Sequence, residues 1–385
     1  MNALLSTVRE LEAWGDRRDW VGPDPYEALN ARRVPAILRR SERGRQGLTQ
    51  LVRLSPIDLR PALGIRPEQS AAALAHVAMA YAAGEFLPRR ELDHKLAWTL
   101  TRLEQLRCRG FDQPCWGYHF DVQTRIFFYP RGAPNTIATS FGGLALIEAY
   151  ERTGQRELLD QAEAVGDFFL RHVPQTESDT GAFFGYLVGD RTPIHNANML
   201  VCALLARLHG HCGRKEFAEA AAAGVAYTIS RQRPDGSWPY AERRGWDWVD
   251  GYHSGYVLDS LLTCVDAGVT TADDAALERG LAYYRDALFL PDGTPRYTTT
   301  STYPIDIQCV AQGIQTPTLA ARRYPWARDL AWSVYRFAST RMRRRDGAFA
   351  FQRRRLWTNS TPHVRWGAAP MLLALAHLHR LEHAG

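Results

Sequence analysis

The sequence lacks any long apolar run. No stretch of its 385 residues approaches the roughly 18 to 20 consecutive apolar residues that a membrane-spanning helix requires. Residues 1–19 carry charges throughout, and they lack the apolar core and the small-residue cleavage site of a secretory signal peptide. We therefore expect a cytoplasmic protein without a membrane span.

Motifs for nucleotides and metals are also missing. The sequence contains no P-loop, no G-x-G-x-x-G, no G-x-S-x-G and no H-E-x-x-H. Its six cysteines form no C-x-x-C pair, and we expect buried free thiols rather than a disulfide framework. The spacing of His195, Asp250 and His253 is not specific for a metal. We therefore predict no cofactor and no bound metal.

The excess of positive charge is small. The formal net charge is +6, and the arginines are spread along the chain apart from the runs 343–345 and 353–355. These runs lack the interleaved aromatic residues of a single-strand nucleic-acid binder. A modest positive charge suits an acidic sugar equally well. We interpret the runs as solvated helix faces and expect no nucleic-acid partner.

A repeated pattern is the strongest feature that is present. An amphipathic segment, a loop of glycine and aromatic residues, and a segment rich in alanine and leucine recur with a period of roughly 60 residues, as in repeat architectures. The loops are 115–118, 181–186, 235–240, 292–297 and 346–351.

Two kinds of helix alternate between these loops. One kind is apolar on nearly all faces, as in residues 199–205, which is typical of a buried helix. The other kind has apolar residues at spacings of three and four, as in residues 158–169, which is typical of a helix with one solvent face. The apolar helices begin near Pro67, Asn135, His195, Tyr252, Pro304 and Pro362, and the half-exposed helices are expected at 26–43, 88–107, 155–172, 214–232, 272–287 and 326–343.

Six buried helices alternating with six half-exposed helices predict an all-α fold, the (α/α)6 toroid, with an inner ring inside an outer ring. One helix pair cannot bury its apolar faces alone, so the ring is expected to form a single domain over residues 24–385. Residues 1–23 are expected to be an N-terminal extension with one extra helix packed on the outside. No array of strands is expected, and residues 298–303 are interpreted as a loop.

The toroid geometry gathers side chains that are distant in sequence. All inner helices run in the same direction, so their amino ends and the loops before them meet in one funnel, where amide N–H groups favour anionic or hydroxyl-rich ligands. Aromatic rings there can cover the apolar faces of a sugar, while polar groups bind its hydroxyl and acid groups. The expected substrate-binding residues are Tyr118, Arg125, Asn196, Asn198, Trp246, Trp248, Asp250, Gln308, Asn359, His363, Arg365 and Trp366.

Several residues of this funnel are candidates for proton transfer. Asp247 stands between two tryptophans, which predicts partial desolvation and the raised pKa that a general acid needs. His195 and His253 are placed near the starts of buried helices, where a neutral imidazole can act as a base. The candidate catalytic residues are Asp247, Asp306, Asp121, His195, His253, Tyr252 and Tyr303.

Structural roles for some of these residues stay open. Asp250 and Asp306 each precede a predicted helix and are equally suited to cap its first turn. Arg365 either clamps the carboxylate of a substrate or forms an ion pair with Asp306 or Asp250.

The segments 24–30, 55–61, 116–121, 195–198 and 303–306 resemble a group of bacterial and archaeal toroid proteins associated with exopolysaccharide and surface-glycan biosynthesis. The resemblance covers nearly the whole chain. It implies an architecture similar to that of glucuronyl C5-epimerases, unsaturated glucuronyl hydrolases and polysaccharide lyases. The loop 232–238 also resembles a repeat of the squalene cyclases, but the D-x-D-D acid motif of those enzymes is missing.

We therefore expect a carbohydrate-active enzyme that uses acid/base chemistry on an acidic, uronic-acid-type polysaccharide or glycoconjugate. Hydrolysis would use Asp247 as the acid, with Asp121 or Asp306 as its partner. Epimerisation or elimination would use histidine or tyrosine as proton carriers and an arginine to neutralise the carboxylate. The alternatives are a non-catalytic glycan-binding protein and a terpenoid-cyclase-like enzyme, although the polar loops argue against the dry cavity of a cyclase. The sequence chooses neither the reaction nor the oligomeric state.

Overall fold

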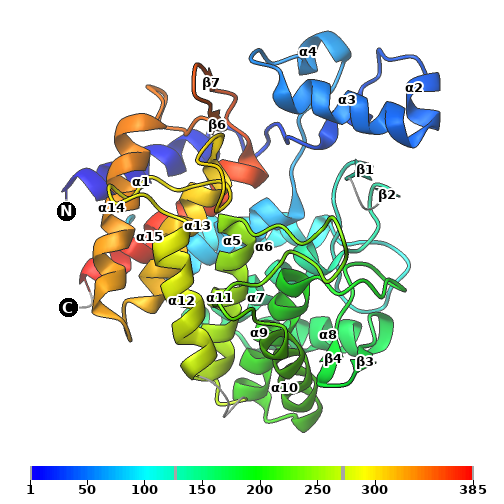
Figure 1. Ribbon diagram of the computed structural model, residues 1–385, viewed down its shortest axis with the longest axis vertical. Coiled ribbons are helices and arrows are strands. Elements are labelled where there is room, and N and C mark those ends of the chain that lie inside the picture. Colours follow the sequence, from blue (N-terminus) through cyan, green and yellow to red (C-terminus); the bar gives the residue numbers. More distant parts are fainter. Residues whose placement is uncertain (1, 125–127, 270–273, 384–385) are drawn as a thin grey trace.

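The computed structural model describes residues 2–124, 128–269 and 274–383. Within these residues, six helices form a closed inner ring, in which each helix packs on the next and the last packs on the first (Figure 1). The predicted (α/α)6 toroid is thereby confirmed. The inner helices are α5 (Ala71–Ala83), α7 (Thr136–Thr153), α9 (His195–Cys212), α11 (Gly251–Asp266), α13 (Ile307–Ala320) and α15 (Ala369–His383).

An outer helix packs on each of the inner helices α5, α7, α9, α11 and α13. The outer helix α8, for example, buries Leu159, Val165 and Phe169 on one face and exposes charged residues on the other, as its amphipathic pattern predicts. These outer helices are α6 (Arg89–Gln105), α8 (Arg156–His172), α10 (Lys215–Ser230), α12 (Asp274–Ala287) and α14 (Pro325–Arg341).

The sixth outer helix is α1 (Asn2–Asp16), which packs along α15. The Asp-Gly turns of the repeats show that its place is equivalent to that of other outer helices. Each turn holds its glycine at positive φ against an outer helix: Gly236 meets α12, Gly293 meets α14 and Gly347 meets α1. The chain end thus completes the outer ring.

The prediction of an outer helix at residues 26–43 is wrong. This region instead contains η1 (Glu27–Asn30) and α2 (Ile37–Arg40), because Pro35 lacks an N–H group and disfavours helix in the residue before it. Helices α3 (Glu42–Leu54) and α4 (Arg60–Leu63) follow, and Ser41 caps α3 through Gly44 N. We call residues 24–65 the cap. It has a small apolar cluster of its own and lies beside the rings, next to β1 (Figure 1).

The strands are short and belong to the loops. In the described ranges they form two hairpins and one three-stranded sheet, and residues 298–303 are a loop with single bridges, as expected. A π-helical segment, η2 (Val364–Ala368), leads into α15. The strands are β1 (Val122–Gln123), β2 (Phe128–Tyr129), β3 (Thr176–Ser178), β4 (Gly181–Phe183), β5 (Ile305–Asp306), β6 (Gln352–Arg353) and β7 (Thr358–Asn359).

All six cysteines are free thiols, as predicted, although Cys108 and Cys212 are only partly buried. In the part of the chain that the structure describes, no helix has the length and apolar character to cross a bilayer.

Candidate functional site

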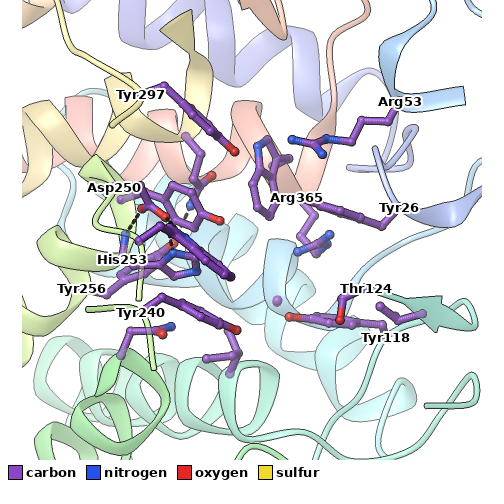
Figure 2. A pocket seen from close by; sticks show the side chains of 18 of the residues that line it. Tyr26, Arg53, Tyr118, Thr124, Tyr240, Asp250, His253, Tyr256, Tyr297 and Arg365 are labelled. Atoms are coloured by element: carbon purple, nitrogen blue, oxygen red, sulfur yellow. Dashed lines mark hydrogen bonds and ion pairs between the residues drawn. The ribbon is translucent and has the colours of Figure 1, made fainter. Parts of the chain in front are cut away.

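A cavity of about 790 Å³ lies at the amino ends of the inner helices, with the cap forming part of its wall (Figure 2). The first two turns of α5, α7, α9, α11 and α13 contribute to its lining, as does η2 ahead of α15. The common funnel expected from the toroid geometry is therefore present. Tyrosines dominate its wall: Tyr26, Tyr118, Tyr129, Tyr186, Tyr240, Tyr252, Tyr256 and Tyr297.

Asp250 and His253 form a hydrogen-bonded pair on this wall. Asp250 caps α11, since its Oδ1 accepts from the backbone N of His253 at 2.9 Å. Its Oδ2 accepts from His253 Nδ1 at 2.6 Å and from Trp248 Nε1 at 3.0 Å. Trp248 stacks on Tyr240 with ring centroids 4.6 Å apart. With Nδ1 as the donor to a buried carboxylate, Nε2 is the basic nitrogen of the imidazole.

The tyrosines beside this pair are neutral hydrogen-bond donors. Burial, followed by the charge of Asp250, raises the pKa of Tyr252 well above its usual value, and burial also raises the pKa of Tyr240 and Tyr256. Tyr256 accepts a hydrogen bond from Gln308 Nε2, which fixes the phenol in place. These phenols stay protonated at neutral pH, so they can stabilise negative charge but cannot act as bases.

A second imidazole, that of His76 on α5, also lines the cavity. Its Nδ1 donates to the carbonyl oxygen of Ala72 at 2.7 Å, and its ring packs against Phe141 with centroids 4.2 Å apart. Burial lowers the pKa of His76 to about 4. The ring is therefore neutral at pH 7 and suited to hydrogen bonding with a hydroxyl group.

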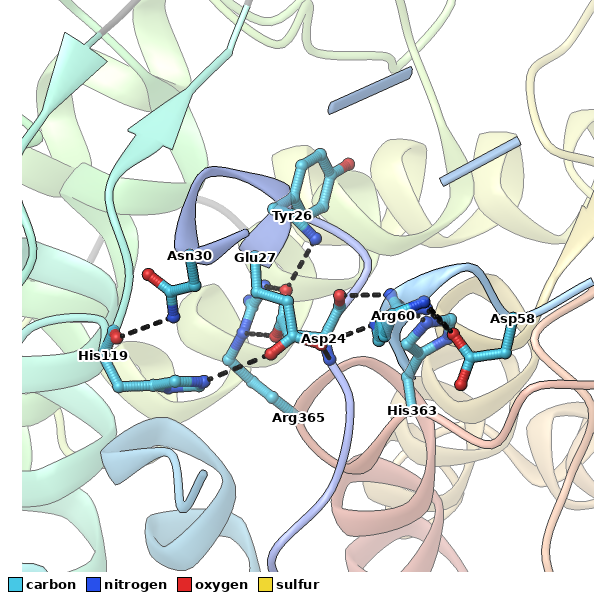
Figure 3. A network of polar contacts seen from close by, with 9 residues as sticks. All are labelled: Asp24, Tyr26, Glu27, Asn30, Asp58, Arg60, His119, His363 and Arg365. Atoms are coloured by element: carbon cyan, nitrogen blue, oxygen red, sulfur yellow. Dashed lines mark hydrogen bonds and ion pairs between the residues drawn. The ribbon is translucent and has the colours of Figure 1, made fainter. Parts of the chain in front are cut away.

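Arg365 enters the cavity from η2 and is paired with Asp24 of the cap (Figure 3). Its Nη2 donates to Asp24 Oδ1 at 2.8 Å and its Nε donates to Oδ2. The guanidinium carbon lies 4.6 Å from the ring centroid of Tyr118 and 5.3 Å from that of Trp366. The expectation that Arg365 pairs with Asp306 or Asp250 is thus wrong, because Arg365 forms its ion pair with Asp24 of the cap.

A buried ion pair inside the cap lies close by, and its arginine also contacts His363 outside the cap (Figure 3). Arg60 Nε donates to Glu27 Oε1 at 2.6 Å, and Arg60 Nη1 donates to Asp58 Oδ1 at 3.0 Å. Arg60 Nη2 lies 3.0 Å from His363 Nε2. Burial, followed by the charge of Arg60, lowers the pKa of His363 well below its usual value, so the neutral ring accepts this hydrogen bond. His363, expected to bind substrate, lies against this ion pair rather than on the cavity wall.

Several of the other predicted site residues do line the cavity. Asp247 is among them, but its side chain is exposed at the mouth, so the partial desolvation expected for it is wrong. The two tryptophans beside it do not cover the carboxylate. The predicted residues on the wall are Tyr118, Asn196, Asp247, Trp248, Asp250, Tyr252, His253, Gln308, Arg365 and Trp366.

Asp306 lies behind the wall and positions two of its members. It caps α13 through Gln308 N at 2.9 Å, and its carboxylate accepts from Trp366 Nε1 at 2.9 Å and Gln352 Nε2 at 2.6 Å. Burial is the main cause of its raised pKa. The fully buried carboxylate therefore holds Gln308 and Trp366 in place instead of facing a substrate.

Other predicted residues are also placed outside the cavity wall. His195 is buried between Thr228 and Glu242, with Nε2 3.2 Å from Glu242 Oε1. Asn198 Nδ2 donates to the carbonyl oxygen of Gly224 at 2.8 Å, so its amide supports the packing of α10 on α9.

Three further predicted residues, Asp121, Trp246 and Tyr303, lie in loops. Asp121 accepts from the backbone N of Arg131, Tyr303 is 42% exposed, and Trp246 stacks under Arg243. Asn359 Nδ2 donates to the carbonyl oxygen of Ser55 at 2.9 Å. Arg125 lies outside the described residues.

Sequence reasoning missed many lining residues, including four that bear on the site. Tyr26 and Arg53 come from the cap, of which only residues 26–43 were assigned to the outer ring. His76 and Tyr256 lie inside inner helices rather than before them. Their signal was the helical spacing, because Tyr256 follows Tyr252 by four residues and so shares its face. In the described part of the chain, His, Cys, Asp and Glu side chains nowhere gather in threes to suit a metal ion.

No protein-family profile matches this chain, and no curated protein matches its sequence. Solved structures do share its fold. A cellobiose 2-epimerase from Bacillus thermoamylovorans superposes with a TM-score of 0.62 at 15% identity, over 82% of this chain and 88% of that chain. A D-mannose isomerase superposes with a TM-score of 0.62 at 12% identity, over 82% of this chain and 87% of that chain. An α-mannanase from Bacteroides thetaiotaomicron superposes with a TM-score of 0.59 at 12% identity, over 82% of this chain and 87% of that chain. The chain therefore shares the (α/α)6 toroid fold with enzymes named for their action on carbohydrates.

Proposed function

We propose that this protein is a carbohydrate-active enzyme that moves a proton on a sugar held in the central cavity. The observation that carries this proposal is the pair formed by Asp250 and His253, with Nδ1 and Oδ2 2.6 Å apart on the cavity wall. A carboxylate that fixes the tautomer and orientation of an imidazole is a recurring arrangement for a general base.

The cavity suits a sugar in both size and lining. Its volume of about 790 Å³ falls within the range of about 300–1,000 Å³ that is typical of small-molecule sites. The rings of Trp248 and Trp366 can cover the apolar C–H faces of a sugar. Gln308, Asn196 and the phenols can bind its hydroxyl groups.

The carboxylates favour proton abstraction over hydrolysis. A glycosidase needs two carboxyl groups roughly 5–9.5 Å apart on either side of the scissile bond. Among the described lining residues, the carboxylates are those of Asp247 and Asp250. Both oxygens of Asp250 are already bonded, to the first turn of α11, to Trp248 and to His253. A pair of free carboxylates is therefore not available on this wall.

His253 Nε2 would remove the proton from a sugar carbon next to a carbonyl or carboxylate group. The C–H electron pair then moves into that group and leaves an enolate, whose negative oxygen is stabilised by the phenols and by Arg365. Return of the proton to the opposite face gives an epimer, its return to the neighbouring carbon gives an isomer, and loss of a β-oxygen gives an elimination product. The epimerase and the isomerase among the structural neighbours support this class of reaction.

The substrate is proposed to be an acidic, uronic-acid-type sugar at the end of a polysaccharide or oligosaccharide. Arg53 and Arg365 both line the wall, and Arg53 supports a negatively charged ligand because, unlike Arg365, it has no carboxylate partner among the described residues. The cap supports recognition of a chain end, because it forms one side of the cavity through Tyr26, Gln50 and Leu54.

Hydrogen exchange with solvent tests the proposed reaction. The protein is incubated in D2O with mannose, glucose, cellobiose or glucuronate oligosaccharides, and the sugar C–H signals are followed by NMR. We expect deuterium to enter one sugar at the carbon next to its carbonyl or carboxylate, and His253→Gln to lower this rate roughly 10²- to 10⁴-fold. His94→Gln, an exposed histidine on α6, is the matched control. Unchanged exchange in His253→Gln would show that another group is the base.

A further inference from the structure

Arg53 reaches the cavity from the last turn of α3 in the cap. Its guanidinium points inward, toward the space between Tyr26 and Tyr297 (Figure 2). The guanidinium carbon is 5.4 Å from the ring centroid of Tyr26. This cation therefore faces the same space as His253, but from the opposite wall.

Arg53 differs from its neighbours in having no acidic partner. Arg60 is paired with Glu27, and Arg365 is paired with Asp24. Among the described residues, no carboxylate oxygen lies within ion-pairing distance of Arg53, and its Nε is buried without a hydrogen-bond partner. A partly buried guanidinium without a neighbouring anion is unfavourable, so the arrangement is suited to a ligand that supplies one.

A second guanidinium also lines the cavity. Arg354, in the hairpin of β6 and β7, also lines the cavity and also has a buried Nε without a partner. Its Nη2 donates to the neutral side chain of Gln352 at 3.3 Å. Asn359 ties this hairpin to the chain just after α3, through the carbonyl oxygen of Ser55.

We propose that Arg53, assisted by Arg354, binds an anionic group of the sugar, either a carboxylate or a phosphate. This inference rests on the proposed function and adds the residues that would select its substrate. A guanidinium offers two parallel N–H groups that match the oxygens of either anion. Tyr297, whose phenol is kept protonated because burial raises its pKa, can add a neutral donor.

Binding measurements on four proteins test this proposal. Calorimetry compares the wild type with Arg53→Met, Arg53→Lys and Arg43→Met, the last being an exposed arginine of the same helix as the matched control. The ligands are glucuronate, glucose 1-phosphate, inorganic phosphate and the neutral sugar glucose. Thermal unfolding of each unliganded variant shows whether it is folded.

The wild type is expected to bind glucuronate or glucose 1-phosphate more tightly than glucose, and the tighter of the two identifies the anion. Arg53→Met should lower the affinity for that ligand roughly 10- to 100-fold, as the loss of a charged hydrogen bond predicts. The affinity for glucose should not change. Arg53→Lys should recover part of the lost affinity, because lysine keeps the positive charge but lacks the two parallel N–H groups of a guanidinium. Arg43→Met should bind as the wild type does.

Equal affinity of the wild type for charged and neutral sugars would overturn the anion site and leave the proposed function standing. An equal loss of affinity for glucose and for glucuronate in folded Arg53→Met would also overturn it, because Arg53 would then support the structure of the cap rather than bind an anion. Binding of inorganic phosphate with no binding of any sugar would contradict the proposed function itself.

Discussion

The Oδ2 atom of Asp250 lies 2.6 Å from Nδ1 of His253, and the same carboxylate caps the helix on which His253 lies. A single side chain thus fixes both the start of α11 and the orientation of the imidazole. Because α11 packs against two neighbours of the inner ring, α9 and α13, the proposed base is held by the core of the fold rather than by a loop.

Asp250→Asn separates these two roles. Asparagine is as good a helix cap as aspartate, so the free energy of unfolding should change by less than about 1 kcal/mol. The neutral amide no longer stabilises a protonated imidazole, so turnover should fall roughly 10²- to 10⁴-fold. Steady-state kinetics and denaturant unfolding on the same variant measure both effects. A fully active Asp250→Asn would remove this carboxylate from the mechanism.

Asp24→Asn tests how the cap is attached. Asp24 and Arg365 have side-chain exposures of 1% and 9%, so the substitution leaves a buried guanidinium without its counter-charge. Loss of one partner from such a pair typically costs about 3–5 kcal/mol of unfolding free energy. Asp160→Asn is the control, since Asp160 and Arg156 are each 58% exposed and their solvent-screened pair should contribute little to stability. Equal effects in the two variants would contradict a buried anchor.

The buried carboxylate of Asp259 on α11 makes stability depend on pH. Burial raises the pKa of Asp259 to about 7, even though Gln312 donates a hydrogen bond to it. Because the folded-state pKa is raised, the stabilisation is complete below the unfolded value of about 4 and is lost as pH rises through 7. Denaturant unfolding at pH 5 and pH 8 should show this loss in the wild type. In Asp259→Asn the unfolding free energy should change less between pH 5 and pH 8. A change as large as that of the wild type would assign the pH dependence to other groups.

Gly255 marks a close approach of α11 to α13. A Cβ atom at this position would lie 2.2 Å from Cγ of Gln312 and 2.9 Å from Oγ1 of Thr316. Gly255→Ala should therefore lower the unfolding free energy by about 1–3 kcal/mol through overpacking. Gly210→Ala is the opposite case, because Gly210 lies in α9 with no atom within 4 Å of its Cβ position. It should stabilise the protein by about 0.5–1 kcal/mol.

The ring of helices could be predicted because its inner members are apolar on all faces, as in residues 199–205. The error at residues 26–43 arose because a helical pattern alone does not show which ring position a segment occupies. The outer helix α1 has the same spacing of apolar residues, at Leu4, Val8 and Leu11, and its place became visible only through the packing of Gly347 against it.

The site could be predicted only in part, because position before a helix does not fix where a side chain points. Asp250 and Asp306 precede helices in the same way, yet Asp250 lines the cavity and Asp306 lies behind Trp366. Arg53 could not be found from the repeats, since it comes from the cap, which is outside them. Its role depends on a contact between segments that are about 300 residues apart, Ser55 and Asn359.

The most direct test of the account is a crystal structure of His253→Gln with the sugar that the wild type exchanges with solvent. We predict that the sugar lies in the central cavity, against Trp248 and Trp366, with its exchanging carbon within about 3.5 Å of the side chain at position 253. A sugar bound elsewhere on the toroid, or one whose exchanging carbon faces away from position 253, would contradict proton abstraction by His253 in the central cavity.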